Sequence, residues 1–189
     1  ITGSTLNVKK SHELHIAPGT EFAPGGAVTL HGNASTTNPD GDLHLATGLR
    51  QDGVATSSIF TANSGAGANL TVAGNWFASS TSIFTMTDGS VNFNSSSTQQ
   101  KSITATSSPF YGLSFNGVAA SSWTVGANAA TTSTSFSINN GTVTAPSTNL
   151  AIGTDFNNQD GLVHNSGTVT FYRTSSNQLL NGSLIGTDA

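Results

Sequence analysis

A stretch of about thirty residues occurs twice in this chain, and the duplication limits the possible folds more than any other sequence feature. Residues 69–100 resemble residues 149–178, and the offset between the copies is slightly smaller at the last matched segment than at the first. The matched segments are 69–72 with 149–152, Trp76 with Phe156, and 89–93 with 167–171. Loops absorb length changes whereas packed faces do not, so this pattern predicts a structural repeat.

Short alternations of apolar and polar residues predict that the repeat is built from β-strands. Leu14-His15-Ile16 and Leu43-His44-Leu45 each place two apolar side chains on one side of an extended backbone. Such segments recur about every 8 to 12 residues along the chain, and clusters of Gly, Pro and Asn separate them. This spacing is typical of an all-β sandwich, barrel or solenoid.

A shorter period inside the long one favours a β-solenoid, also called a β-helix. Six of the places where valine follows glycine, directly or after one residue, begin at Gly26, Gly53, Gly89, Gly117, Gly141 and Gly167. Four of the five separations are similar in length, and the small-residue segment 63–68 accounts for the longer one. We therefore predict coils of about 26 residues, three of which span the long repeat. The alternative is a β-sandwich or jelly-roll subunit that associates by strand complementation.

The solenoid interpretation predicts which side chains stack in the core. The predicted core stack comprises the apolar positions that the two copies share: Leu70, Val72, Trp76, Val91, Phe93, Leu150, Ile152, Phe156, Val169 and Phe171. Trp76 and Phe156 occupy matched positions, so we interpret both as core residues and not as a sugar-binding platform. The repeats would extend over residues 69–189, and residues 1–68 would form an N-terminal β region that acts as a cap or contact region.

The composition excludes several classes of function. Only 7% of the 189 residues are charged, and the five Lys and Arg residues are dispersed, so the chain offers no basic stripe for nucleic acid. There is no cysteine to form disulfides or thiolate metal sites. No apolar run in the sequence approaches the length of about 18 residues that a membrane span requires.

The segments Phe-Ser-Ile-Asn-Asn-Gly-Thr-Val at 136–143 and Phe-Tyr-Gly-Leu-Ser-Phe at 110–115 carry a family resemblance. With their surroundings, residues 69 to 186 resemble the Gly/Asn/Thr-rich repeats of large bacterial secreted surface proteins. The resemblance implies a repeated β-structure that serves as a stalk, filament or adhesin, without a catalytic set. It also implies an extracellular or cell-surface location, reached after removal of a signal segment.

Two groups of residues are candidate metal sites. His15 and His44 share the polar position of their strands and are separated by close to one predicted coil, so they can stack and bind zinc, copper or nickel. A polar surface ladder is the favoured interpretation of this pair. Asp40 and Asp42 flank Gly41 in an oxygen-rich segment suited to calcium, although a simple turn also explains it and is favoured.

We predict that the chain is not an enzyme and needs no cofactor, with calcium as the one cofactor that its residues suggest. Its expected partner is another copy of itself, joined through sheet edges at Leu6 and Val8 or at Leu184 and Ile185. Surface glycans are a second candidate partner. The alternative function is a carbohydrate-binding or carbohydrate-cleaving β-helix with its site near residues 38–52, where Arg50 and Asp52 join the two acids.

Overall fold

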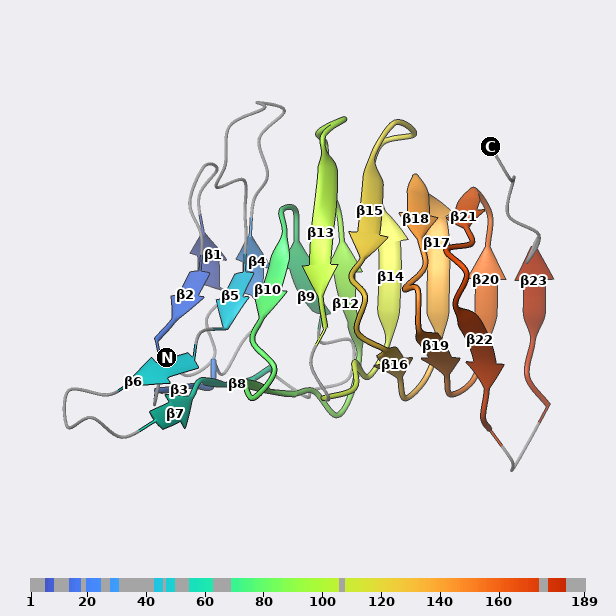
Figure 1. Cartoon of the computed structure of the whole chain (residues 1–189). Helices are drawn as coiled ribbons and strands as arrows, with labels where there is room; N and C mark the ends of the chain where they lie inside the picture. The colour runs from blue at the N-terminus through green and yellow to red at the C-terminus, as the bar shows by residue number, and fades with distance from the viewer. Residues whose placement is uncertain are drawn as a thin grey trace.

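The chain folds as a β-solenoid whose turns stack along one axis (Figure 1). The computed structural model describes residues 6–8, 14–17, 20–24, 28–30, 43–45, 47–49, 55–62, 69–105, 108–173 and 177–182. Within these ranges all regular elements are β-strands, and all strand pairs except one are parallel. The predicted β-solenoid is confirmed, whereas a sandwich or jelly roll would require antiparallel pairing throughout.

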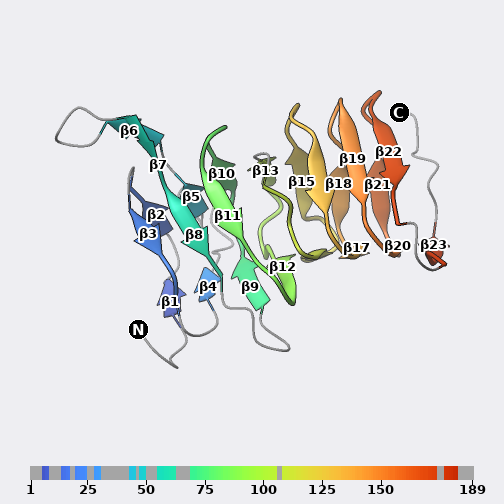
Figure 2. The ribbon, with the colours of Figure 1, turned by 90° about the horizontal axis from the view of Figure 1, so that it is seen from below.

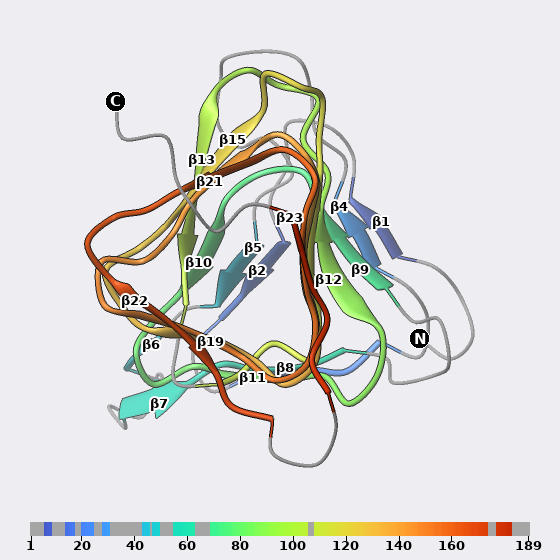
Figure 3. The same ribbon diagram turned by 90° about the vertical axis from the view of Figure 1, so that its right-hand side faces the viewer.

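The turns form three faces, which are visible when the molecule is viewed along its axis (Figure 3). The first face, sheet A, has eight strands: β1 (Leu6–Val8), β4 (Val28–Leu30), β9 (Asn69–Val72), β12 (Ser90–Phe93), β14 (Leu113–Asn116), β17 (Phe136–Asn140), β20 (Phe156–Asn158) and β23 (Leu180–Gly182). The second face, sheet B, has seven: β2 (Leu14–Ile16), β5 (Leu43–Leu45), β10 (Trp76–Ala78), β13 (Gln100–Thr104), β15 (Ser122–Val125), β18 (Thr142–Thr144) and β21 (Gly161–Val163).

The third face consists of two short sheets that follow one another along the axis (Figure 2). One contains β3 (Glu21–Phe22), β8 (Ile59–Thr61) and β11 (Ile83–Thr85), and the other contains β16 (Ala130–Thr132), β19 (Asn149–Ile152) and β22 (Thr168–Phe171). A parallel bridge between Phe110 and Thr132 joins the intervening turn to β16. The antiparallel pair β6 (Thr47–Leu49) and β7 (Ala55–Ser57) forms a hairpin inserted between sheet B and the third face.

One turn takes about 22 residues, which corrects the predicted coil length of about 26 residues. Along sheet A, the aligned positions recur at nearly equal intervals, each of them shorter than the predicted coil: Leu70, Val91, Leu113, Phe136, Phe156 and Leu180. A much longer turn lies between Val28 and Leu70, and it contains the inserted hairpin.

The Gly-Val signals overestimated the period because they do not mark one place in the turn. Gly89 precedes β12 in sheet A, Gly141 precedes β18 in sheet B, and Gly167 precedes β22 in the third face. Successive signals thus precede strands of different faces. The number of residues between two signals therefore covers complete turns and also the distance from one face to the next, which makes it longer than the turn itself.

The two copies of the duplicated stretch lie on different faces for the same reason. β9 belongs to sheet A, but its sequence counterpart β19 belongs to the third face, three complete turns and two further faces along the chain. Trp76 likewise begins a strand of sheet B, whereas its counterpart Phe156 begins a strand of sheet A. The copies share a local strand-turn-strand pattern, and the interpretation as equivalent three-coil modules is wrong.

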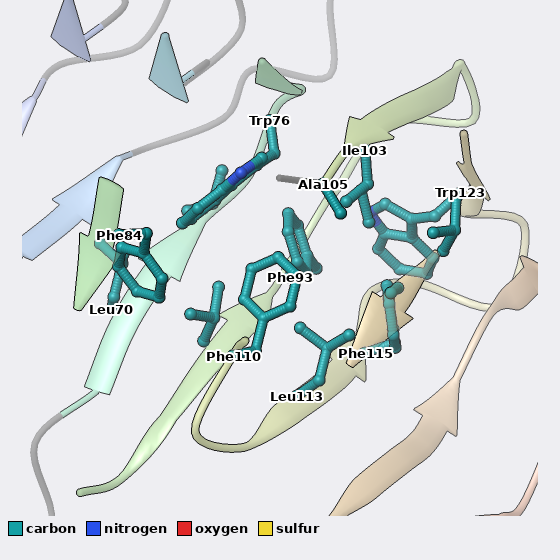
Figure 4. Close-up of a cluster of buried hydrophobic side chains, with 14 of the residues drawn as sticks. Leu70, Trp76, Phe84, Phe93, Ile103, Ala105, Phe110, Leu113, Phe115 and Trp123 are labelled. Carbon is teal, nitrogen blue, oxygen red and sulfur yellow. The ribbon is translucent and has the colours of Figure 1, made fainter. Parts of the chain in front are cut away.

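Inward-facing side chains form continuous columns along the axis. In sheet A, Phe93 stacks on Phe115 with ring centroids 5.3 Å apart and an interplanar angle of 14°. Phe136 stacks in the same way on Phe156 at 6.0 Å. Trp76 packs edge-to-face against Phe84 at 4.9 Å in the same core (Figure 4). Burial of such a ring contributes about 1.5–3 kcal/mol, and ring geometry about 0.5–1.5 kcal/mol more, so apolar burial dominates.

Buried and partly buried hydroxyl groups join the turns at the corners, where the strand ladders are interrupted. The Ser121 Oγ donates hydrogen bonds to the carbonyl oxygens of Ser95 and Ser97 in the preceding turn, at 2.9 and 3.1 Å. At another corner, the Thr134 Oγ1 donates to the Tyr111 carbonyl at 2.6 Å. These bonds give hydrogen-bond partners to carbonyl groups at the corners, which explains why small hydroxyl residues occupy these places.

The columns predict a large cost for truncating a stacked ring. Phe115, at 0% exposure, contacts rings on both sides of its turn. We expect Phe115→Ala to lower the free energy of unfolding by about 3–5 kcal/mol, because it leaves a cavity in the column. Val118→Ala is the matched control, since Val118 is 44% exposed, and it should change stability by less than about 0.5 kcal/mol. Urea denaturation followed by circular dichroism measures both, and equal effects would contradict the columnar core.

Candidate functional site

The backbone register brings together His15 and His44, the pair predicted to form a polar surface ladder and considered as a candidate metal site. The Cα atoms of His15 and His44 are partners in the pairing of β2 with β5, and His15 is exposed. The description of His44 is confined to its backbone. Among the residues that the structure describes, no three His, Cys, Asp or Glu side chains gather closely enough to hold a metal ion. Asp40, Asp42, Arg50 and Asp52 lie outside the described residues, so the calcium and carbohydrate-site predictions stay predictions.

Several carboxylates in the described turns have structural partners. Asp88 Oδ1 accepts a hydrogen bond from the Gly89 amide at 2.7 Å, and Asp160 Oδ2 accepts one from the Gly141 amide at 2.7 Å. Asp155 Oδ1 accepts from the Leu179 amide at 2.9 Å. Each of these carboxylates stabilises a turn or an end strand by binding a backbone N–H group.

His164 organises the turn before β22. Its Nδ1 accepts a hydrogen bond from the Ser166 amide at 3.3 Å, and its Nε2 lies 2.9 Å from the Gly167 carbonyl oxygen. This pairing is satisfied by the neutral tautomer that carries its proton on Nε2. Ser166 has a φ of 59°, a left-handed conformation that the ring contacts help to hold. The local geometry therefore assigns His164 a structural role.

Lys101 is a residue whose position the sequence reasoning missed. It is one of the five dispersed Lys and Arg residues of the sequence, yet its side chain is only 2% exposed. It points inward from β13, and its register partner in β15 is Trp123. The signal was present in the sequence, because Lys101 alternates in phase with the inward residue Ile103. Its long aliphatic stem can pack within an apolar column.

The predicted core-stack residues divide between the middle and the end of the solenoid. The fully buried members are Leu70, Val72, Trp76, Val91, Phe93, Leu150, Ile152 and Phe156. Val169 and Phe171 lie in the terminal strand β22 and are only partly buried against the core. At the opposite end Leu6, Leu14 and Phe22 are also only partly buried. The core is therefore incompletely covered at both ends of the described solenoid.

The outside of sheet A carries a row of uncharged hydrogen-bonding side chains, here called the outer row. Its members are aligned by the parallel register: Thr29, Thr71, Asn92, Ser114, Ser137, Asn157 and Asn181, with Asn7 at the corresponding backbone position of β1. At its C-terminal end the Asn181 Nδ2 donates to the Asn157 Oδ1 at 2.8 Å. Such amide ladders stabilise stacked parallel strands.

The most exposed large apolar residues of the described chain lie at β23, the C-terminal edge of sheet A. Leu179 is 65% exposed and Leu180 is 51% exposed. The Gln178 Nε2 holds the preceding segment in place by donating to the carbonyl oxygen of Thr154 at 2.6 Å. Of the four residues predicted for assembly, Leu6 and Val8 lie in β1 at the opposite edge of sheet A, and Leu184 and Ile185 lie outside the described residues. Figure 1 places β1 and β23 at opposite ends of the molecule.

Comparisons with known proteins add no family assignment. No protein-family model and no curated protein matches the sequence, and no solved structure matches the fold. The part of the chain that the structure describes contains no apolar helix long enough to cross a membrane. The features of this chain that bear on function are therefore the solenoid, its outer row and the strands β1 and β23.

The attachment of β23 predicts a local effect of substituting Gly182. This residue has a φ of +94°, and a Cβ atom at this position would collide with the Asn158 carbonyl group of the neighbouring strand. We expect Gly182→Ala to detach β23, so that the amides of residues 180–182 exchange hydrogen at least about tenfold faster, which corresponds to about 1.4 kcal/mol. Gly126→Ala is the control, because its Cβ would lie 3.4 Å from the nearest atom, the Ile103 carbonyl oxygen. Unchanged exchange at β23 would contradict this role of Gly182.

Proposed function

We propose that this protein is a non-enzymatic structural element of an extracellular bacterial surface assembly, as a segment or subunit of a stalk, filament or adhesin. The observation that carries the proposal is the unbroken parallel stacking of sheet A, which continues through eight strands from β1 to β23. In such a stack each turn covers the edge of its neighbour, and the outermost turns retain edges suited to further association.

The core supports a mechanical role. Its buried apolar cluster runs from Ile16 in the first turn to Leu162 near the last. Separate domains would be joined by segments with few contacts, whereas here the column of side chains is continuous. A continuous column resists bending because every interior turn is packed on both sides, as a rigid spacer requires.

The surface chemistry supports the same proposal. The described carboxylates of Asp88, Asp155 and Asp160 bind backbone amides, and no candidate metal cluster occurs among the residues that the structure describes. The outer row presents amides and hydroxyls without charge. The resemblance of residues 69–186 to Gly/Asn/Thr-rich surface repeats agrees with a structural role, and it is the basis for the extracellular bacterial location.

A carbohydrate-binding protein is the second candidate, and the outer row is the observation that favours it. Amide and hydroxyl groups repeat there at the strand spacing of about 4.8 Å, and they can exchange hydrogen bonds with sugar hydroxyls. Aromatic rings are the usual platforms for sugars, but the rings of Trp76 and Trp123 are buried in the core, and the exposed rings of Phe77 in β10 and Tyr172 after β22 do not belong to the outer row. This difference makes the structural role the stronger proposal.

Electron microscopy combined with a polysaccharide-binding assay tests the proposed function. We expect the purified chain to form rods or fibres of uniform width that lengthen with protein concentration, because open sheet edges associate by mass action. Polysaccharides should be neither bound with saturation nor shortened. Single particles of uniform size that bind or cleave a polysaccharide would instead support the carbohydrate alternative and overturn the structural role.

A further inference from the structure

We infer that strand β23 of one molecule accepts strand β1 of a second copy, in parallel and in the register Leu6 on Leu180 and Asn7 on Asn181. Sheet A would then continue from one copy into the next, head to tail. This inference rests on the proposed structural function, because it names the surfaces through which the chain associates and their alignment.

The two strands present incomplete positions of the same apolar column. Leu180 is the register partner of buried Phe156, so it continues the inward column of sheet A, yet it is 51% exposed. Leu6 begins that column at the other end, as the partner of buried Val28, and is itself only partly buried. Stacking Leu6 on Leu180 would cover both side chains and join the two columns.

The alternation of the two strands determines their register. β1 reads Leu-Asn-Val and β23 reads Leu-Asn-Gly, so aligning Leu6 with Leu180 pairs all three residues of each strand, whereas a slip of two residues would leave only one pair. A slip of one residue would place Asn7 in the apolar column and Leu6 in the outer row, which costs both apolar burial and amide hydrogen bonds.

The outer row supports the same alignment. The Asn181 Nδ2 already donates to the Asn157 Oδ1 at 2.8 Å within one molecule. In the proposed register the next position of the row is Asn7, so three asparagines would follow one another at successive strands. A second copy is thus the partner whose own edge strand matches both the inward and the outward positions of β23.

The geometry of this contact favours an open polymer over a closed dimer. β1 and β23 are different surfaces at opposite ends of the molecule (Figure 2), so the interface is heterologous. Addition of one copy leaves the β23 of that copy open for the next. β23 lies one strand further along the chain than β22, the last described strand of the third face, and two strands further than β21, the last described strand of sheet B. The proposed strand pairing therefore concerns sheet A alone.

A charge test addresses the register directly. The double variant Asn7→Asp with Asn181→Asp would stack two carboxylates at neighbouring strands of the interface, so we expect association at pH 7 to weaken at least about tenfold. Size-exclusion chromatography with light scattering measures the molar mass over a range of concentrations. Either single substitution, which opposes one carboxylate to one amide, should leave association near that of the unmodified chain. Asn7→Lys with Asn181→Asp should restore association through opposite charges.

A matched control separates the register from net charge. Asn94→Asp with Gln99→Glu adds the same two negative charges at exposed positions between the interior strands β12 and β13, and association should be unchanged. Circular dichroism verifies that each variant is folded. Acidification below about pH 4, the ordinary range of Asp ionisation, should restore association of the Asn7→Asp, Asn181→Asp variant.

A mixing experiment tests the head-to-tail arrangement. Leu180→Lys places a charge on the C-terminal edge only, and Leu6→Lys places one on the N-terminal edge only, so each variant alone should be monomeric. An equal mixture should form dimers and no longer species, because the intact β1 of the first variant adds to the intact β23 of the second.

The outcomes distinguish this inference from the proposed function. Polymers that persist in the Asn7→Asp, Asn181→Asp variant would overturn the register and leave the structural role standing. An unmodified chain that stays monomeric at every concentration would overturn the inference. Only affinity or activity toward polysaccharides would overturn the structural role itself.

Discussion

Parallel pairing between successive turns is the constraint on which the rest of this structure depends. Because a strand in one turn aligns residue by residue with the strand in the next, each side chain lies on its equivalent at about 4.8 Å. Most positions that are apolar in one turn are therefore apolar in its neighbours, as Val91, Leu113 and Phe136 are. The same alignment collects the polar positions into the outer row. Core and surface are therefore two consequences of a single register.

The corners make this register compatible with an irregular sequence. Turns of unequal length align in sheet A because the extra residues are taken up between strands. Buried Ser121 and partly buried Thr134 bind carbonyl groups of the preceding turn at such places. The hairpin of β6 and β7 extends this tolerance, since it is inserted into one turn while β4 and β9 remain paired around it. Local length variation thus leaves the stacking intact.

A stack of this kind is complete in its interior and incomplete at its ends. Phe115 has rings above and below it, whereas Phe171 and Leu180 each have a buried register partner, Ile152 and Phe156 respectively, on one side only. Association of the ends would therefore repeat the interactions that already hold neighbouring turns together, without a new type of contact. The scarcity of charge has the same consequence, because uncharged edges do not repel one another. The fold and the proposed assembly share one physical basis.

The sequence by itself determined the strand class, the alternation and most of the core, because whether a residue faces inward depends on its immediate neighbours. Leu70, Trp76 and Phe93 could be placed inside on that ground, and the alternation that puts Lys101 in phase with Ile103 carried the same information.

The tertiary structure alone decided the length of a turn and the face on which each strand lies. β9 and β19 have similar sequences but belong to different faces, because a strand's face depends on the summed lengths of all the corners before it. His15 and His44 pair although their separation exceeds the usual length of a turn, so this pairing too depends on the local corner lengths. The exposed edge at Leu180 likewise depends on the tertiary structure, which makes β23 the last described strand of sheet A.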